Sequence, residues 1–241
     1  MARKAITFIE VDTEVSITDK VADFAAVVSN RKGEVLTSCA ILVKGIYDDP
    51  DTHTLFHNEN VGELWKSENL NNRYQAYENM LERGSRMMAS IHAINNWLMM
   101  AKAQYDPILT AYNLPFDLSK CRNTGINLDM FDRKFCLWSA CVTAFAQTKK
   151  YRKFILDNHL FTNRTDFGNM SYRTNAEVMT RYILGNADLP DEPHCSLEDI
   201  MGYEKPLLDK LLKVKSVKWL LNHTLPYNWR NFQVKDWFKP I

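Results

Sequence analysis

Apolar runs separated by polar turns predict three strands in the first part of the chain. Residues 5–12, 21–29 and 34–43 are rich in Ile, Val, Phe and Ala, and the polar turn Asn-Arg-Lys-Gly at 30–33 separates the second run from the third. Consecutive strands joined by short turns favour an antiparallel meander. We therefore expect the chain to begin with three antiparallel strands.

Farther along, helical spacing alternates with short apolar runs. Two runs predict further strands, at 107–112 and 134–137. Residues 44–71 show no period and predict a long loop with one short helix near 61–66. The expected helical segments are 72–104 with a break at Gly84-Ser85, 116–124, 137–146, 174–184, and an apolar stripe over 197–212 that Pro206 interrupts. This order predicts an α/β fold with a mixed five-stranded sheet flanked by helices.

Composition excludes a globally basic nucleic-acid binder. The 241 residues carry 30 Lys and Arg against 29 Asp and Glu, and 46% are apolar, enough for a sizeable core. A nucleic-acid partner would therefore need local basic patches. Five scattered cysteines without a C-x-x-C pair indicate reduced thiols, and the first apolar run is too short for a membrane segment. We expect a cytoplasmic protein without a membrane partner.

The C-terminal part differs from the rest in charge and aromatic content. From Lys205 onward there are eight basic and two acidic residues. Six aromatic residues crowd this part: Trp219, Tyr227, Trp229, Phe232, Trp237 and Phe238. We interpret residues 1–204 as one domain and 205–241 as an extension packed on it. Stacking on single-stranded bases and a homodimer interface remain alternatives.

Acidic residues gather at the ends of predicted elements. Glu10, Asp12 and Glu14 alternate at the end of the first strand and so point to one face of it. Asp117 begins a helix after the fourth strand, and Asp199 lies in the first turn of a later helix. Carboxylates are the ligands that Mg²⁺ prefers, and two such ions about 3.5–4 Å apart catalyse phosphodiester hydrolysis. The pattern indicates a two-metal phosphodiesterase.

A histidine completes this set. His194 precedes Asp199 by five residues, on the loop before its helix. A mobile imidazole at that place fits a general base that accepts the proton of the attacking water.

Three ordered motifs resemble those of the DEDD superfamily of 3′–5′ exonucleases, in its histidine subgroup. The first is Phe8-Ile9-Glu10-Val11-Asp12-Thr13, similar to the family's Phe-Ile-Asp-Val-Glu-Thr with the acids exchanged. The second is Tyr112-Asn113-Leu114-Pro115-Phe116-Asp117, and the third is His194-Cys195-Ser196-Leu197-Glu198-Asp199, with Ser for Ala. The resemblance spans residues 8–199 and implies a ribonuclease-H-like fold.

The first motif has a second register, because Asp12-Thr13-Glu14 also fits Asp-x-Glu directly. The stretch 21–27, which resembles the family's second strand, favours the first register slightly. The resemblance implies that Asp12, Asp117, Asp199 and Glu10 hold two Mg²⁺ or Mn²⁺ ions, with Glu14 as the alternative to Glu10. His194 is then the general base.

The implied activity is hydrolysis of single-stranded nucleic acid from a free 3′ end, releasing nucleoside monophosphates, with DNA favoured. Two alternatives stay open: an exoribonuclease like RNase T or oligoribonuclease, and an inactive nuclease fold used as a binding module. Each motif alone is also typical of ordinary structure. Asp117 fits a helix N-cap, and Asp199 fits an acid favoured by the helix dipole.

Overall fold

The computed structural model describes residues 5–16, 18–49, 67–161 and 171–225. The expected short helix at 61–66 and most of the expected loop at 44–71 lie outside these ranges. So do the five aromatic residues that the sequence places beyond residue 225. None of the helices built from the described residues combines the length and apolar character needed to span a bilayer.

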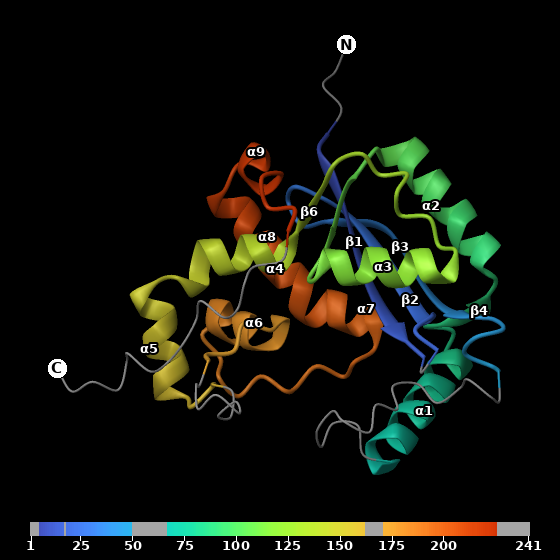
Figure 1. Cartoon of the computed structure of the whole chain (residues 1–241), viewed down its shortest axis with the longest axis horizontal. Helices are drawn as coiled ribbons and strands as arrows, with labels where there is room; N and C mark the ends of the chain where they lie inside the picture. The colour runs from blue at the N-terminus through green and yellow to red at the C-terminus, as the bar shows by residue number, and fades with distance from the viewer. Residues whose placement is uncertain (1–4, 17, 50–66, 162–170, 226–241) are drawn as a thin grey trace.

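A mixed sheet of six strands forms the centre of the described structure (Figure 1). The strands are β1 (Thr7–Val15), β2 (Val21–Asn30), β3 (Val35–Val43), β4 (Met87–Ala89), β5 (Ile108–Ala111) and β6 (Lys134–Cys136). Their spatial order is β4-β3-β2-β1-β5-β6. β1, β2 and β3 form the expected antiparallel meander, while β5 and β6 continue the sheet in parallel from β1. The predicted α/β class with a mixed sheet is confirmed.

The predicted number of five strands is wrong, because β4 was missed. This strand is three residues long and pairs in parallel with Ile41–Val43 at the outer edge of β3. Its two methionines fall in phase with the helical spacing on either side, so local periodicity assigns them to a helix. Only the pairing with β3, which is distant in sequence, makes this segment a strand.

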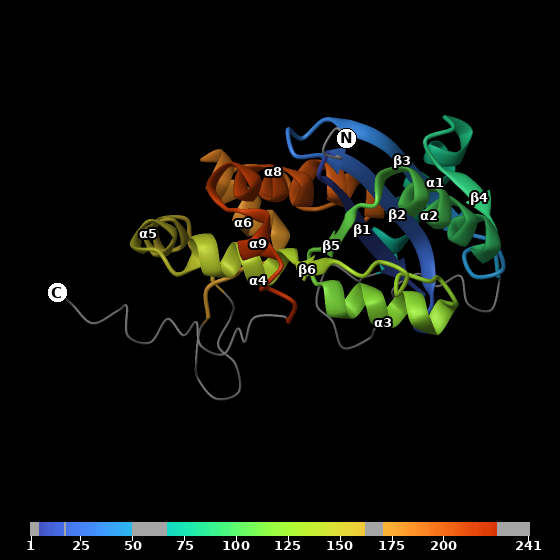
Figure 2. The same ribbon diagram turned by 90° about the horizontal axis from the view of Figure 1, so that it is seen from above.

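The helices cover both faces of the sheet (Figures 1 and 2). They are α1 (Ser67–Glu82), α2 (Ile91–Tyr105), α3 (Leu114–Thr124), α4 (Leu137–Cys141), α5 (Lys149–Asp157), α6 (Ala176–Leu184), α7 (Ser196–Asp199), α8 (Lys205–Val214) and α9 (Val217–Leu220), with π-helical segments η2 (Val142–Ala146) and η3 (Ile200–Glu204). The predicted segments at 116–124, 137–146 and 174–184 agree closely with α3, α4 with η2, and α6. As expected from Pro206, a new helix begins there: α8 carries this proline in its first turn.

Alternation along β1 divides its side chains between two cores. Ile9 and Val11 pack with α2 and α3 on one face. Phe8 packs with α4, α6 and α8 on the other, where Ile200 of η3 also covers β2. The described part of the expected extension contributes buried leucines of α8 and α9 to this second core. The acids of β1 share the face of Phe8, so α7, η3 and α8 determine their surroundings.

Candidate metal centre

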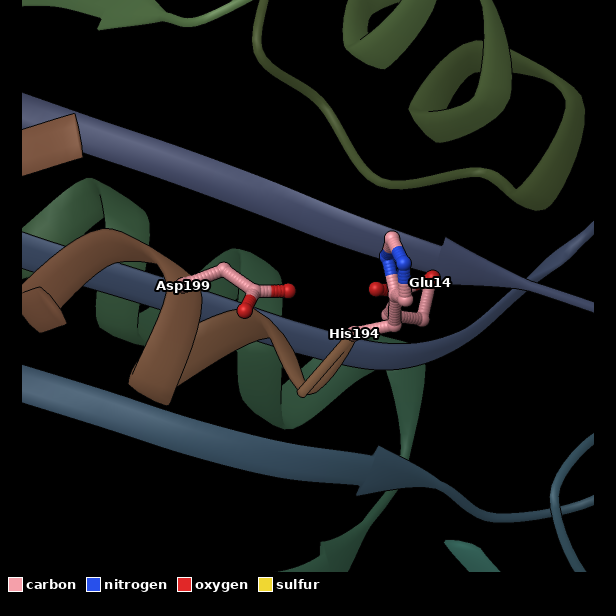
Figure 3. Close-up of side chains that lie close together, drawn as sticks. All are labelled: Glu14, His194 and Asp199. Atoms are coloured by element: carbon pink, nitrogen blue, oxygen red, sulfur yellow. The ribbon is translucent and has the colours of Figure 1, made fainter. Parts of the chain in front are cut away.

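Glu14, His194 and Asp199 form a group that could hold a cation. Ligand atoms of the three side chains all lie within 4.8 Å of one another. Figure 3 shows the Asp199 carboxylate directed toward Glu14 and His194. Asp199 is buried, whereas Glu14 and His194 are half-buried, so the group opens toward solvent on one side. A solvated ion could enter there.

Three different local structures position these residues. Glu14 lies near the end of β1, at a register irregularity between Glu14 and Val15. Such bulges bend a strand and re-aim its side chains, and they are common beside active sites. His194 lies on the loop before α7 with a positive φ of 54°, and Asp199 ends α7 where η3 begins. π-Helical turns are likewise frequent at functional sites.

Asp12 and Asp117 form a second acidic pair, and neither belongs to the group of Glu14, His194 and Asp199. The hydroxyl of Thr13 donates a hydrogen bond to Asp117 Oδ1 at 2.8 Å, which ties the first turn of α3 to β1. Burial, and then the charge of Asp12, raises the pKa of Asp117 well above its usual value. Burial, and then the charge of Asp23, raises the pKa of Asp12 to about 7. The two carboxylates therefore repel each other when both are ionised.

Glu10 has different surroundings from Glu14, although both lie on the same face of β1. Its side chain is completely buried, and neither carboxyl oxygen has a hydrogen-bond partner among the described residues. Burial raises the pKa of Glu10 to about 8, offset in part by the positive charge of Lys205. The structure therefore brings Glu14, and not Glu10, into the group with His194 and Asp199. Which glutamate completes the first motif stays a prediction, and this geometry favours Glu14.

The loop that carries His194 is held at its N-terminal side. Arg181 donates to the carbonyl oxygen of Leu189 at 2.6 and 2.9 Å, and the Tyr203 hydroxyl lies 2.9 Å from that of Pro190. Arg181 also pairs with Asp191 at 2.7 Å. These contacts fix the segment leading to His194, which has no regular secondary structure of its own.

Two further glutamates, Glu192 and Glu204, lie near Asp12, and the three sequence motifs did not indicate them. Burial, and then the charges of Asp12 and Glu177, raises the pKa of Glu192 to about 8. Burial, and then Asp12 and Asp117, raises the pKa of Glu204 well above its usual value. Glu192 precedes His194 by two residues, and this closeness was the available sequence signal. For Glu204, which ends η3 five residues after Asp199, no local sequence pattern offered a signal.

The donor set fits a hard divalent cation. Glu14 and Asp199 offer carboxylate oxygens, the ligand type that Mg²⁺ and Mn²⁺ prefer, and His194 offers an imidazole nitrogen. The mutual repulsion of Asp12 and Asp117 would be relieved by a positive ion between or beside them.

Two other features of the described structure are a pocket and the cysteines. A pocket of about 620 Å³ at the edge of β3 and β4 is lined by Trp97 and Met100 of α2, and none of the candidate ligands lines it. All five cysteines are described and are free thiols, as the sequence predicted. Burial raises the pKa of the Cys121 and Cys141 thiols well above the usual value, which makes them poor nucleophiles.

Comparison with known proteins adds no family assignment. No protein-family model matches the chain, and no curated protein matches it in sequence.

Proposed function

We propose that this protein is a metal-dependent 3′–5′ exonuclease that hydrolyses single-stranded nucleic acid, with DNA as the favoured substrate, to nucleoside monophosphates. The observation that carries the proposal is the grouping of Glu14, His194 and Asp199 from segments far apart in sequence. The three ordered motifs that resemble the DEDD exonucleases support it. An antiparallel meander continued by parallel strands also supports the ribonuclease-H-like fold that this resemblance implies.

The chemistry would be divided between bound ions and the side chains of this chain. Two Mg²⁺ or Mn²⁺ ions would supply charge stabilisation for the phosphoryl group and activation of water near neutral pH. Asp12, Glu14, Asp117 and Asp199 would bind and orient them. Thr13 keeps Asp117 in place through its hydrogen bond at 2.8 Å.

His194 would accept the proton of the attacking water. Its half-buried position beside Glu14 and Asp199 suits this role, because the imidazole is both near the acids and accessible to solvent. A histidine has an unperturbed pKa near neutrality, so it can accept and release a proton in each cycle. A single strand is the expected substrate because a 3′ end must separate from its stack to reach the acids.

A cleavage assay tests this proposal. Single-stranded DNA and RNA of one sequence, each labelled at the 5′ end, are incubated with Mg²⁺ or Mn²⁺, with EDTA as the metal-free control. We expect a ladder that shortens from the 3′ end, mononucleotide products, and no cleavage with EDTA. The ratio of DNA to RNA cleavage decides between the two substrates.

Two results would contradict the proposal. If neither substrate is degraded at high protein concentration, the hypothesis of an exonuclease is wrong and the alternative of a binding module remains. Immediate release of the labelled 5′ nucleotide would remove the proposed polarity. The Asp117→Asn variant serves as the matched control against a contaminating nuclease, because it preserves side-chain size and removes a proposed ligand.

A further inference from the structure

Arg86, immediately before β4, binds two carboxylates from opposite parts of the chain. Its Nε lies 3.3 Å from Asp23 Oδ1 on β2, and its Nη1 lies 3.4 Å from Glu198 Oε1 on α7. Its Nη2 also pairs with Glu198 Oε2. Arg86 is 2% exposed and Asp23 is fully buried, so their pair is shielded from solvent, whereas the Glu198 side chain is 35% exposed. A planar guanidinium is suited to such a double contact.

Asp23 connects the same bridge to the backbone of α7. Its Oδ2 accepts the backbone N–H of Ser196 at 3.0 Å and lies 3.0 Å from the Tyr77 hydroxyl of α1. The N–H groups in the first turn of a helix have no partner within the helix, and Asp23 satisfies one of them. Asp23 therefore holds the beginning of α7, while Arg86 holds Glu198 near its end.

These two attachments lie between His194 and Asp199 of the candidate centre. Ser196 follows His194 by two positions, and Glu198 directly precedes Asp199. Asp23 also lies opposite Glu14 in the pairing of β1 with β2. The bridge thus joins β2, at the residue paired with Glu14 of β1, to the short helix that carries Asp199.

The backbone at His194 requires such support. A positive φ of 54° is unfavourable for a residue with a side chain, and it persists only where the surroundings fix it. The Tyr77 hydroxyl, which contacts Asp23, also lies 3.5 Å from the carbonyl oxygen of His194. α7 is the first turn of a helix that continues through η3 into α8, and its N-cap residue Cys195 makes no side-chain capping bond, so contacts from other segments must satisfy its first N–H groups.

We propose that Arg86 is a positioning residue: by bridging Asp23 and Glu198, it places His194 and Asp199 at the distance from Glu14 that metal binding needs. This inference rests on the proposed function only in assuming that Glu14 and Asp199 bind a cation. Arg86 itself contacts neither substrate nor ion. Removing it would leave Asp23 as a buried charge without its cation, and α7 would lose its attachment at Glu198 and keep only the contact of Ser196 with Asp23.

Three variants separate positioning from general stabilisation. Glu198→Gln removes one charge and leaves the buried pair of Arg86 and Asp23 intact. Arg86→Lys keeps the charge but loses the planar double contact, and Arg86→Met removes both. The control is Asp129→Asn, which removes the exposed pair of Arg122 and Asp129 at 3.0 Å, away from the acids. Mn²⁺ affinity, kcat, KM and melting temperature are measured for each.

We expect Mn²⁺ affinity and kcat to fall by about 10-fold in Glu198→Gln and about 100-fold in Arg86→Met, the range typical of residues that orient metal ligands. KM for the oligonucleotide should change little, and Arg86→Lys should recover part of the loss. Asp129→Asn should match the wild type. Wild-type Mn²⁺ affinity and kcat in both Glu198→Gln and Arg86→Lys, with only a lower melting temperature, would overturn the inference.

The Mn²⁺ measurement also distinguishes the two failures. If the wild type binds Mn²⁺ but degrades no nucleic acid, the proposed function fails, and the Mn²⁺ affinities of the variants still judge the role of Arg86. If the wild type binds no Mn²⁺, the positioning inference is overturned with it.

Discussion

Two glutamates on one face of β1 have opposite surroundings. Glu14 is half-buried, near the bulged end of the strand, with its carboxylate close to His194 and Asp199. Glu10 is four residues earlier, completely buried, and its charged neighbours are Lys205 and Asp209. Both residues are glutamates, and the alternation of side chains along β1 places both on the same face of the sheet. The covering elements differ: α7 and its preceding loop lie at Glu14, and the start of α8 lies at Glu10.

This contrast shows what strand periodicity can and cannot determine. A period of two assigns a residue to a face of the sheet. The depth of that residue beneath the covering helices depends on contacts between distant segments. The half-buried Glu14 is able to bind an ion from solvent. The buried Glu10, whose pKa is raised to about 8, holds a proton at neutral pH.

The largest expected effect on nuclease activity comes from the Asp117→Asn variant in the first turn of α3. Loss of a proposed ligand should lower nuclease activity by more than the roughly 10²–10⁴-fold that removal of a general base costs. The fold should remain intact, because the change removes repulsion with Asp12 and preserves side-chain size. Activity assays with circular dichroism check this. A variant with wild-type activity would exclude Asp117 from the centre.

His194→Gln should have the next largest effect. If His194 is a base, kcat should fall by about 10²–10⁴-fold while Mn²⁺ affinity changes by only a few fold. Single-turnover kinetics and isothermal titration with Mn²⁺ separate the two quantities. An equal loss of Mn²⁺ affinity would instead make His194 a ligand of the group that Figure 3 shows.

The paired variants Glu14→Gln and Glu10→Gln test the comparison itself. Glu14→Gln should lower kcat by at least the roughly 10–100-fold typical of groups around a metal. Glu10→Gln should leave kcat within a few fold of the wild type, because the buried side chain would not contact the ions. The reverse order of effects would show that the first register of the motif is the correct one.

A smaller effect concerns stability and pH. Burial raises the pKa of Glu10 from 4.5 to about 8. A carboxyl group with a higher pKa in the folded state stabilises the fold at acid pH, and this contribution is lost as pH rises through about 8. Glutamine does not titrate, so the Glu10→Gln variant lacks this loss of stability at high pH. The melting temperature of the metal-free variant, relative to the wild type, should therefore be higher at pH 9 than at pH 5.

The expected difference is several degrees, since about 1 kcal/mol corresponds to roughly 2–4 °C in a domain of this size. Differential scanning calorimetry in the presence of EDTA measures it. The same difference between variant and wild type at both pH values would mean that Glu10 does not titrate in this range.

Local patterns in the sequence predict much of the fold. The three strands of the meander, the strands before α3 and α4, and the helix restart at Pro206 all follow from apolar runs, turns and a proline. β4 could not be predicted, because two methionines in helical phase form a strand only against Ile41–Val43 of β3. The structure places Asp117 and Asp199 in first turns of helices, where the sequence expected them.

The rest of the candidate centre depends on long-range contacts. The sequence favoured Glu10 over Glu14 because the apolar residues of the first strand and the stretch 21–27 fit the motif in that register. No local pattern encodes the packing of α8 over Glu10. The bridge of Arg86 to Asp23 and Glu198 joins residues 63 and 112 positions apart in the chain. A single sequence contains no signal for such a pairing.

A crystal structure with Mn²⁺ and a nucleoside monophosphate tests the central claim most directly, because anomalous scattering locates the ions. We predict Mn²⁺ among the carboxylates of Asp12, Glu14, Asp117 and Asp199, with His194 facing the phosphate and no ion at Glu10. Mn²⁺ bound by Glu10, or no Mn²⁺ at any of these acids at saturating concentration, would contradict the account.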